Sequence, residues 1–196
     1  MSKFTEIIKK NRDDIIKPVA VLLAICIVIP LALSLTDKIT AKKIAALEAE
    51  NSKKNMSALV KADSFEKLNA GDTEYYAAIL NGETAAYIFT ENAKGYGGDV
   101  SVMTAVKPDG TVAGVAVLDV SNETPGLGQN AAKESFFSQF AGLKKGVSLL
   151  KNGADHDNNE IDAVTGATVT STAVTRAVNK ALDNFEKIKG AAENEE

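Results

Sequence analysis

The residue types that could do chemistry are concentrated in three short loops. The first loop is Gly95-Tyr96-Gly97-Gly98, which we expect at the mouth of a strand. Three glycines in four residues permit positive φ and a close approach of the backbone to a flat ligand. A flexible hairpin loop explains the same composition, and this loop taken alone favours that plainer interpretation.

The second loop combines a turn signal with an apolar side chain. Pro125-Gly126 predicts a turn, and Gly128 keeps the chain bare of side chains. Leu127 is then an apolar residue held out on a loop, where a flat hydrophobic ring could pack. A tight turn into the next helix is an equally good explanation. The loop comprises Glu123, Thr124, Pro125, Gly126, Leu127 and Gly128.

The third loop precedes an expected helix and places a hydroxyl beside minimal side chains. Gly166 and Ala167 come directly before Thr168. Helix N-termini present unpaired N–H groups and positive potential, so they bind phosphate well. A phosphodiester on Thr168 would gain about 0.3 to 1 kcal/mol from the helix dipole. An N-cap run is the alternative, because Ser and Thr are favoured at that position.

Composition limits the chemistry outside these loops. The chain has 196 residues with one Cys and one His, which excludes an intramolecular disulfide, an all-Cys iron–sulfur or zinc site and a multi-His metal site. The formal net charge of -4 argues against a nucleic-acid partner. Residues 155–160 mix carboxylates with His156 but lack the EF-hand spacing, so a solvated loop is favoured over a Ca²⁺ site.

Together, the three loops resemble the FMN-binding family that includes the G subunit of the Rnf complex and the C subunit of the sodium-pumping NADH:quinone reductase. That family has a membrane anchor followed by a GYGG loop, an ETPGLG loop and a terminal S/T-GAT motif. This chain has all three motifs in that order within about 75 residues. Its short length is more similar to the Rnf protein than to its quinone-reductase relative, which usually carries a longer insert.

The resemblance implies a covalent cofactor. In this family, FMN is joined through its phosphate to the last Thr of the GAT motif, here Thr168, and a flavin transferase makes the bond from FAD. Family members often have Gly where this chain has Ala163, which is a small departure. The implied recognition element of the transferase consists of Asp162, Thr165, Gly166 and Ala167.

The expected FMN site includes all three loops. We expect the flavin ring to lie against Leu127 and the backbone of the GYGG loop, with Thr124 or backbone N–H groups at its polar edge. Thr168 has no base beside it in the sequence, since His156 lies twelve residues away, so a separate enzyme must form the ester. No catalytic residue and no metal ligand is expected. The expected cofactor-binding residues are Tyr96, Gly97, Gly98, Glu123, Thr124, Pro125, Gly126, Leu127, Gly128, Thr165, Gly166, Ala167 and Thr168.

The resemblance also implies a function and partners. It indicates the electron-carrying redox subunit of a membrane-bound ferredoxin:NAD⁺ oxidoreductase that translocates Na⁺ or H⁺, without a complete active site of its own. The implied partners are the A, B, C, D and E subunits of a six-subunit Rnf complex, a flavin transferase and membrane lipid. Three alternatives stay open: a stand-alone extracytoplasmic FMN carrier, the C subunit of a Na⁺-translocating NADH:quinone reductase, and a sensor or adhesion domain in which TGAT only caps a helix.

One segment near the N-terminus is long enough to cross a bilayer. Pro18 to Leu35 holds eighteen uncharged residues, and a spanning helix needs roughly 18 to 20. A signal peptide has a shorter apolar region, and a lipoprotein needs a small residue where Ile25 precedes Cys26, so an uncleaved anchor is favoured. Five basic residues precede the segment and three follow it. This bias predicts a single-pass protein of the cytoplasmic membrane, with its N-terminus in the cytoplasm and its domain outside.

The elements that must position the loops form an α+β domain with an antiparallel sheet and flanking helices. Asn81-Gly82 and Asp109-Gly110 are hairpin signals. They punctuate four runs rich in β-branched or aromatic residues: Tyr75–Leu80, Thr84–Thr90, Val100–Val106 and Thr111–Val120.

Apolar periodicity predicts two helices, Ala131–Phe140 and Thr170–Lys187. The expected organisation is a cytoplasmic segment 1–17, a transmembrane helix 18–36, a helical stalk 37–62, an FMN-binding domain 63–190 and an acidic tail 191–196.

Overall fold

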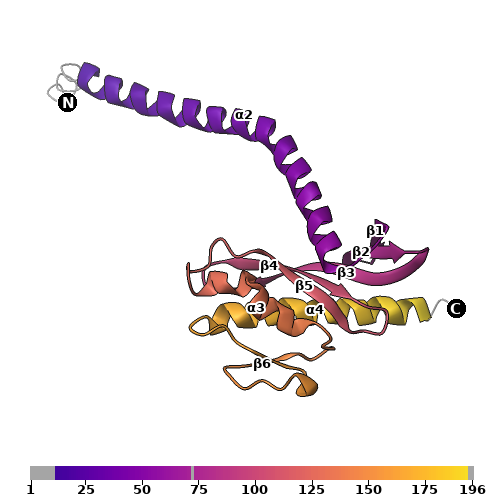
Figure 1. Ribbon diagram of the computed structural model, residues 1–196. Helices are drawn as coiled ribbons and strands as arrows, with labels where there is room; N and C mark the ends of the chain where they lie inside the picture. Colours follow the sequence, from indigo (N-terminus) through magenta and orange to yellow (C-terminus); the bar gives the residue numbers. More distant parts are fainter. Residues whose placement is uncertain (1–11, 72, 194–196) are drawn as a thin grey trace. The chain divides into compact units, whose positions relative to one another are not determined.

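The computed structural model describes residues 12–71 and 73–193 (Figure 1). The chain divides into two compact units between Asn51 and Ser52. Two predicted segments lie partly outside the described residues: the cytoplasmic segment 1–17 up to residue 11, and the acidic tail 191–196 from residue 194.

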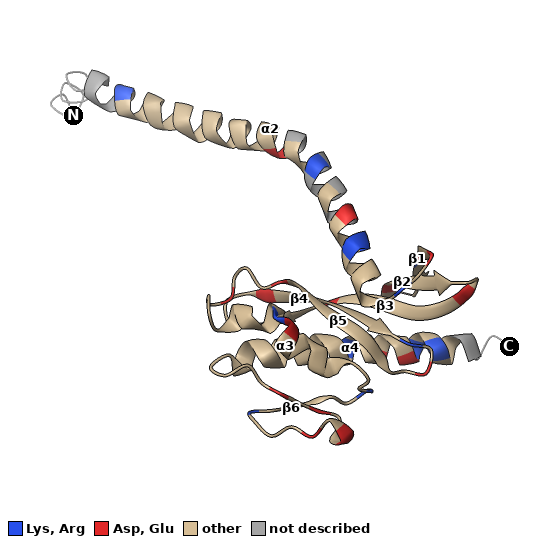
Figure 2. Ribbon diagram, in the orientation of Figure 1, with Lys and Arg blue, Asp and Glu red and all other residues tan. Residues whose placement is uncertain are grey.

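The first unit consists of most of helix α2, which spans Arg12–Leu59. Its segment Ile16–Asp37 has 22 residues with a mean hydropathy of 2.8, and no charge lies between Lys17 and Asp37 (Figure 2). Nothing described in the chain buries the apolar side chains of this segment. By length and composition it could cross a bilayer, in agreement with a single-pass anchor. Since α2 runs unbroken past residue 36, the division between anchor and stalk stays a prediction.

The second unit contains a five-stranded antiparallel sheet with the strand order β1-β2-β3-β4-β5. The four predicted runs correspond to β2 to β5, and β1 is an addition at the edge. Asn81 and Gly82 both have positive φ, 55° and 84°, as a two-residue hairpin turn requires. The strands are β1 (Ser64–Ala70), β2 (Thr73–Leu80), β3 (Glu83–Lys94), β4 (Asp99–Val106) and β5 (Val112–Asp119).

The segment after the sheet differs from the prediction. The helix expected over Ala131–Phe140 is wrong as a single element, because Lys133 adopts an extended backbone with φ −83° and ψ 144°. Three short pieces replace it: η1 (Gly128–Ala132), α3 (Glu134–Phe137) and η2 (Ser138–Phe140). Phe136 and Phe140 are nevertheless buried and meet edge to face, with ring centroids 5.8 Å apart. Both rings therefore belong to the hydrophobic core.

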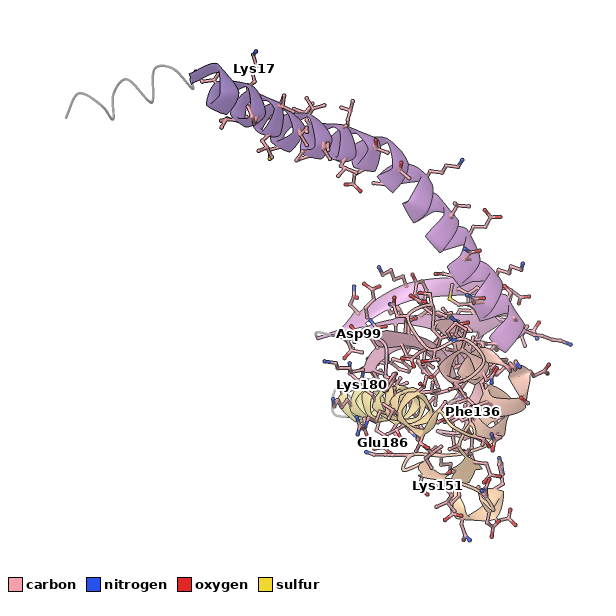
Figure 3. All side chains as sticks on the ribbon, turned by 90° about the vertical axis from the view of Figure 1, so that its left-hand side faces the viewer. Lys17, Asp99, Phe136, Lys151, Lys180 and Glu186 are labelled. Atoms are coloured by element: carbon pink, nitrogen blue, oxygen red, sulfur yellow. The ribbon has the colours of Figure 1, made fainter. Side chains whose placement is uncertain are left out.

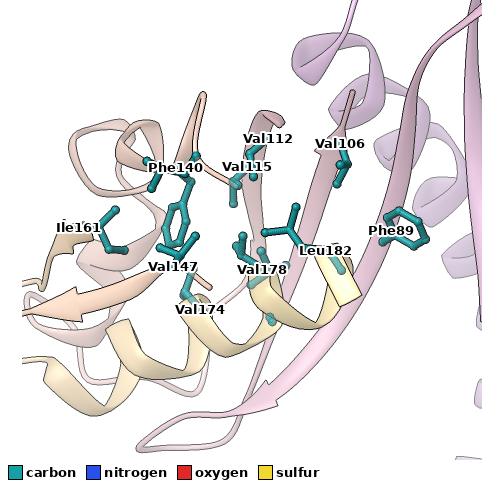
Figure 4. Close-up of a cluster of buried hydrophobic side chains, with 14 of the residues drawn as sticks. Phe89, Val106, Val112, Val115, Phe140, Val147, Ile161, Val174, Val178 and Leu182 are labelled. Carbon is teal, nitrogen blue, oxygen red and sulfur yellow. The ribbon is translucent and has the colours of Figure 1, made fainter. Parts of the chain in front are cut away.

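The last helix, α4 (Thr168–Glu193), supplies the main core face. Val174, Val178 and Leu182 are buried at the predicted helical spacing and pack toward the sheet residues Val115 and Phe89 (Figure 4). The opposite face of the sheet packs around Met56, in the end of α2 that belongs to this unit. The α+β class and its antiparallel sheet are therefore confirmed.

Polar side chains fix α4 against its neighbours. Glu91 of β3 is nearly buried, forms an ion pair with Lys180 at 2.6 Å, and accepts a hydrogen bond from the Asn184 amide at 2.7 Å. On the other side, the Asn179 amide donates to the carbonyl of Val147 at 2.8 Å.

That side of α4 carries a small lobe, residues 148–162, here called the β6–β7 lobe. It contains the parallel strands β6 (Ser148–Leu150) and β7 (Glu160–Asp162) with η3 (His156–Asn158) between them. α4 therefore lies between the five-stranded sheet and the β6–β7 lobe (Figure 1).

Candidate functional site

The three loops come together at the start of α4. They surround a cavity of about 600 Å³, within the range of small-molecule and cofactor sites. Each of the three loops contributes at least one residue to the lining of this cavity. The lining residues are Tyr96, Glu123, Thr124, Leu127, Gly128, Gly166, Ala167, Thr168, Val169 and Thr170.

The buried side chain of Glu123, in the second loop, bonds to the first loop and to the start of α4. Its side chain is 3% exposed. One carboxyl oxygen accepts the N–H of Gly97 at 3.0 Å, and the other accepts the hydroxyl of Thr170 at 2.5 Å. Because buried polar atoms are costly without partners, this arrangement fixes the first loop and the first turn of α4 to the second loop. Glu123 thus has a structural role: it holds the parts of the site together.

The second loop forms the predicted turn. The N–H of Leu127 donates to the carbonyl of Thr124 at 3.1 Å, and Gly126 has φ +77°, a value that glycine adopts without steric cost. The turn leaves the Leu127 side chain 44% exposed at the cavity. Gly128 is buried, and a Cβ there would lie 2.6 Å from Glu123 Oε2. Only a hydrogen side chain fits at this position.

The third loop leads into α4 with Thr168 as the first helical residue. Gly166 has φ +78°, and a Cβ there would lie 3.0 Å from the Leu127 side chain. The first backbone bond of the helix runs from the N–H of Ser171 to the carbonyl of Ala167, so the N–H groups of residues 168–170 are available to a ligand. The bare glycine and the open N–H groups fit a phosphate-bearing group.

Thr168 does not cap the helix. Ala167, the residue before the helix, accepts the first backbone bond of α4 and has no side-chain acceptor. The Thr168 side chain is exposed, and its hydroxyl has no hydrogen-bond partner among residues 12–71 and 73–193. The N-cap interpretation of the third loop is therefore wrong, and the hydroxyl is left accessible at the cavity wall.

The rim of the cavity is apolar and open to solvent. Tyr96 is 76% exposed and Val169 is 52% exposed, and both border the cavity with Leu127. A flat hydrophobic ring would cover part of this surface and lose contact with water. The apolar rim and the polar helix start together fit a ligand with a ring at one end and a phosphate at the other.

Several predicted site residues lie beside the cavity and do not line it. Pro125 and Gly126 shape the turn, and Gly98 accepts the N–H of Gly95 at 2.8 Å to close the first loop. Gly95, Gly97 and Gly98 do not have positive φ, so the special backbone conformation of glycine is not what the first loop uses. The glycines are instead packed closely against residues 122 and 123, where a Cβ would not fit. Thr165 lines a second hollow of about 240 Å³.

Asp162 lies away from the main cavity. Its Oδ1 accepts the N–H of Ala154 at 2.9 Å, and its backbone exchanges hydrogen bonds with the side chain of Gln139. Asp162 and Gln139 line a separate hollow of about 420 Å³. In the folded domain, the Asp162 carboxylate thus holds the loop that follows β6.

No proton acceptor pairs with Thr168 from the acidic loop. His156 Nε2 donates to the carbonyl of Ala141 at 3.1 Å, and Asp155 accepts the N–H of Asp157 and the amide of Asn158. These bonds give the 155–160 run an internal structural role. Within the described ranges, no group of three or more His, Cys, Asp or Glu side chains could hold a metal ion.

The sequence pattern does not mark two of the cavity residues. Val169 and Thr170 lie inside the regular pattern of α4, so nothing in their spacing distinguishes them from ordinary helix residues. The helical offset from Thr168 is the only signal, because residues of the first turn necessarily surround a ligand at the N-terminus.

A family model and several known proteins match this chain. The family model of the FMN-binding domain matches residues 95–183, which contain all three loops. The G subunit of a proton-translocating ferredoxin:NAD⁺ oxidoreductase complex from Clostridium ljungdahlii is 35% identical, over 92% of this chain and 97% of that protein. The G subunit of the Na⁺-translocating complex from Acetobacterium woodii is 33% identical, over 86% of this chain and 90% of that protein.

Solved structures support the fold. The crystal structure of NqrC from Shewanella oneidensis superposes with a TM-score of 0.53 at 26% identity, over 62% of this chain and 63% of that chain. The C subunit of the Na⁺-translocating NADH-quinone reductase from Parabacteroides distasonis gives a TM-score of 0.51 at 26% identity, over 58% and 61%. This chain therefore spans less than two thirds of either quinone-reductase protein. From the near-complete match to the two Rnf-type relatives and from the FMN-binding domain, we conclude that the chain belongs to the G-subunit family of ion-translocating ferredoxin:NAD⁺ oxidoreductase (Rnf) complexes.

Proposed function

We propose that this chain carries electrons through an FMN that is bound covalently to Thr168 by a phosphodiester. The observation that carries the proposal is the position of Thr168, the first residue of α4. Its side chain is exposed on the wall of a cofactor-sized cavity, and its hydroxyl is bonded to none of the described residues. FMN would supply reversible electron transfer, and the protein would supply position and surroundings.

The cavity residues divide the binding work. The N–H groups of the first turn of α4 would face the phosphate, since they have no partner within the helix. Leu127, Val169 and Tyr96 would contact the ring, and Thr124 would meet its polar edge. Glu123 keeps these parts in register through its bonds to Gly97 and Thr170.

Formation of the bond requires a second enzyme. The Thr168 oxygen would join the FMN phosphorus of FAD, the diphosphate bond would break, and AMP and one proton would leave. The described part of the chain places no base on the Thr168 hydroxyl, and His156 is occupied at Ala141. A flavin transferase fills this role in the proposal, with Asp162, Thr165, Gly166 and Ala167 as its recognition element.

The proposed setting is the cytoplasmic membrane. The apolar helix segment Ile16–Asp37 would cross the bilayer once, with the N-terminus in the cytoplasm and the FMN domain outside. The positive-inside bias of the sequence supports this orientation. The proposed partners are the A, B, C, D and E subunits of an Rnf complex, because the Rnf-type relatives named above match this chain over nearly its whole length.

Expression beside a flavin transferase tests the attachment. The denatured wild-type chain should give a flavin fluorescence band on a gel, and Thr168→Ala should abolish it. Thr172→Ala is the matched control, because Thr172 lies one turn further along α4 and donates to the Thr168 carbonyl. A bare wild-type chain, or fluorescence that persists in Thr168→Ala, would contradict the attachment site.

Co-purification tests the assembly. Mild detergent extraction from the native membrane should recover this chain with multi-span and iron–sulfur subunits. Recovery of the flavin-loaded chain alone would favour the stand-alone carrier.

A further inference from the structure

Thr168 lies between two hollows. One is the large cavity with the apolar rim, and the other is the smaller hollow of about 240 Å³. The two share only Gly166 and Thr168 among their lining residues. The smaller hollow is lined by Lys151, Asn152, Ala163, Val164, Thr165, Gly166 and Thr168.

The two hollows differ in charge. Lys151 is the only charged residue among the described lining of the smaller hollow. It is exposed and forms no ion pair within the described residues. Glu123 is the charged residue of the large cavity, and both of its oxygens are already bonded to Gly97 and Thr170. A phosphodiester monoanion on Thr168 would thus find an unengaged cation on one side only.

The β6–β7 lobe holds Lys151 in place. β6 and β7 pair in parallel with Leu150 opposite Asp162, and the N–H of Ala163 donates to the carbonyl of Leu150 at 2.8 Å. The carboxylate of Asp162 accepts the N–H of Ala154 at 2.9 Å. These bonds anchor both ends of the loop that carries Lys151 to the strand leading into the third loop. Figure 3 shows Lys151 on this lobe.

We propose that the smaller hollow is the phosphate subsite and that the ammonium group of Lys151 pairs with the phosphodiester on Thr168. The inference rests on the proposed covalent FMN and adds that its ring and its phosphate occupy different hollows. The apolar cavity takes the ring, and the hollow with Lys151, Asn152 and Thr165 takes the anionic linkage. Lys151 and the first turn of α4 then place positive potential on two sides of one negative charge. Asp162 acts as a positioning residue because it fixes the Lys151 loop.

Chemical labelling of the full-length chain tests the pairing directly. The chain is prepared with and without a co-expressed flavin transferase, and its lysines are acetylated under limiting reagent and quantified by mass spectrometry. An ammonium group paired with an anion is less available to the acetylating reagent, so loading should lower the reactivity of Lys151 by roughly threefold. Lys133 is the matched control, because it lines the neighbouring hollow with Ala163 and Val164 but without Thr168. Its reactivity should stay the same.

Phosphorus NMR separates contact with the phosphate from simple coverage by the ring. Lys151→Gln should move the phosphodiester resonance of the loaded protein, Lys151→Arg should keep it close to the wild-type position, and Lys133→Gln should leave it unchanged. A loaded Thr168 with equal Lys151 reactivity and an unmoved resonance would overturn the subsite while the attachment stands. A Thr168 that carries no flavin in the wild type would overturn both.

Discussion

Thr170, in the first turn of α4, donates its hydroxyl hydrogen to Glu123 Oε2 over 2.5 Å, and both side chains are buried. The other oxygen of Glu123 accepts the N–H of Gly97. Two loops and a helix that are far apart in the sequence are therefore connected through one carboxyl group.

Thr170→Val should destabilise the domain, because it leaves one buried oxygen of Glu123 without a donor. The expected loss is about 1 to 3 kcal/mol in the free energy of unfolding. Thr170→Ser keeps the hydroxyl and should lose much less. Thermal or urea unfolding of the detergent-solubilised full-length chain measures both variants. Equal stabilities of the Val and Ser variants would contradict the role of the hydrogen bond.

Gly128→Ala should disturb the same connection by overpacking. The new Cβ would lie 2.6 Å from Glu123 Oε2 and 2.9 Å from the Thr170 hydroxyl. We expect a loss of about 1 to 3 kcal/mol in unfolding free energy and lower flavin loading. Gly190→Ala is the control, since a Cβ there meets no atom within 4 Å. Gly190 lies in helix α4, so alanine should raise the free energy of unfolding by up to about 1 kcal/mol. Normal loading and stability of Gly128→Ala would show that the loop tolerates the methyl group.

Leu127→Ala should loosen the flavin ring without unfolding the protein, since the side chain is 44% exposed. Each 1.4 kcal/mol of lost ring contact shifts the docking of the tethered ring about tenfold. Iodide quenching of flavin fluorescence should therefore increase, while the melting temperature stays nearly constant. Leu150→Ala, at a side chain that is 37% exposed and outside the cavity, should change neither the quenching nor the loading. Unchanged quenching in Leu127→Ala would place the ring elsewhere.

Alkaline pH should destabilise the core at Tyr75. Burial raises the pKa of this phenol, which packs against Phe89 with ring centroids 5.7 Å apart. The folded state favours the neutral phenol, so this stabilisation is complete below the unfolded pKa of about 10 and is lost as the pH rises through the folded pKa. Tyr75→Phe should make the unfolding free energy decline less steeply above that range. An identical alkaline decline in both proteins would contradict this assignment.

Much of the sheet follows from local sequence signals. Asn81-Gly82 adopts the two positive φ values of its hairpin, and the strands on either side of it match the predicted runs within a few residues. β1 was missed because most side chains of Ser64–Ala70 are exposed and polar, so no apolar alternation marks the strand. An edge strand of this kind is defined by its pairing with β2, which only the tertiary structure reveals.

The broken helix before β6 has a similar cause. Phe136, Phe137 and Phe140 have the spacing of one helical face. The side chain of Gln139 nevertheless bonds to the backbone of both Phe136 and Asp162. The contact with Asp162 spans 23 residues, and tertiary contacts of this kind override the local helical preference of a segment.

In the candidate site, too, some features follow from the sequence and others only from the tertiary structure. The three loops could be identified in the sequence because together, and in that order, they resemble the motifs of an FMN-binding family, although each loop alone has a plainer explanation. Their mutual contacts through Glu123, and the place of Lys151 beside Thr168, depend on strand pairing and on the packing of α4. Neither is encoded in the spacing of the residues.

Helix α4 bears Thr168 at its first residue and the core side chains Val174 and Val178 within its next turns. With the proposed attachment, the point that bears the prosthetic group would move only with the folded domain, because the core fixes the next turns of α4. Electron tunnelling slows steeply with separation, so the distance from the proposed flavin to a donor or an acceptor would depend on where the whole domain lies. The location of the domain would therefore set the rate at which the proposed flavin exchanges electrons.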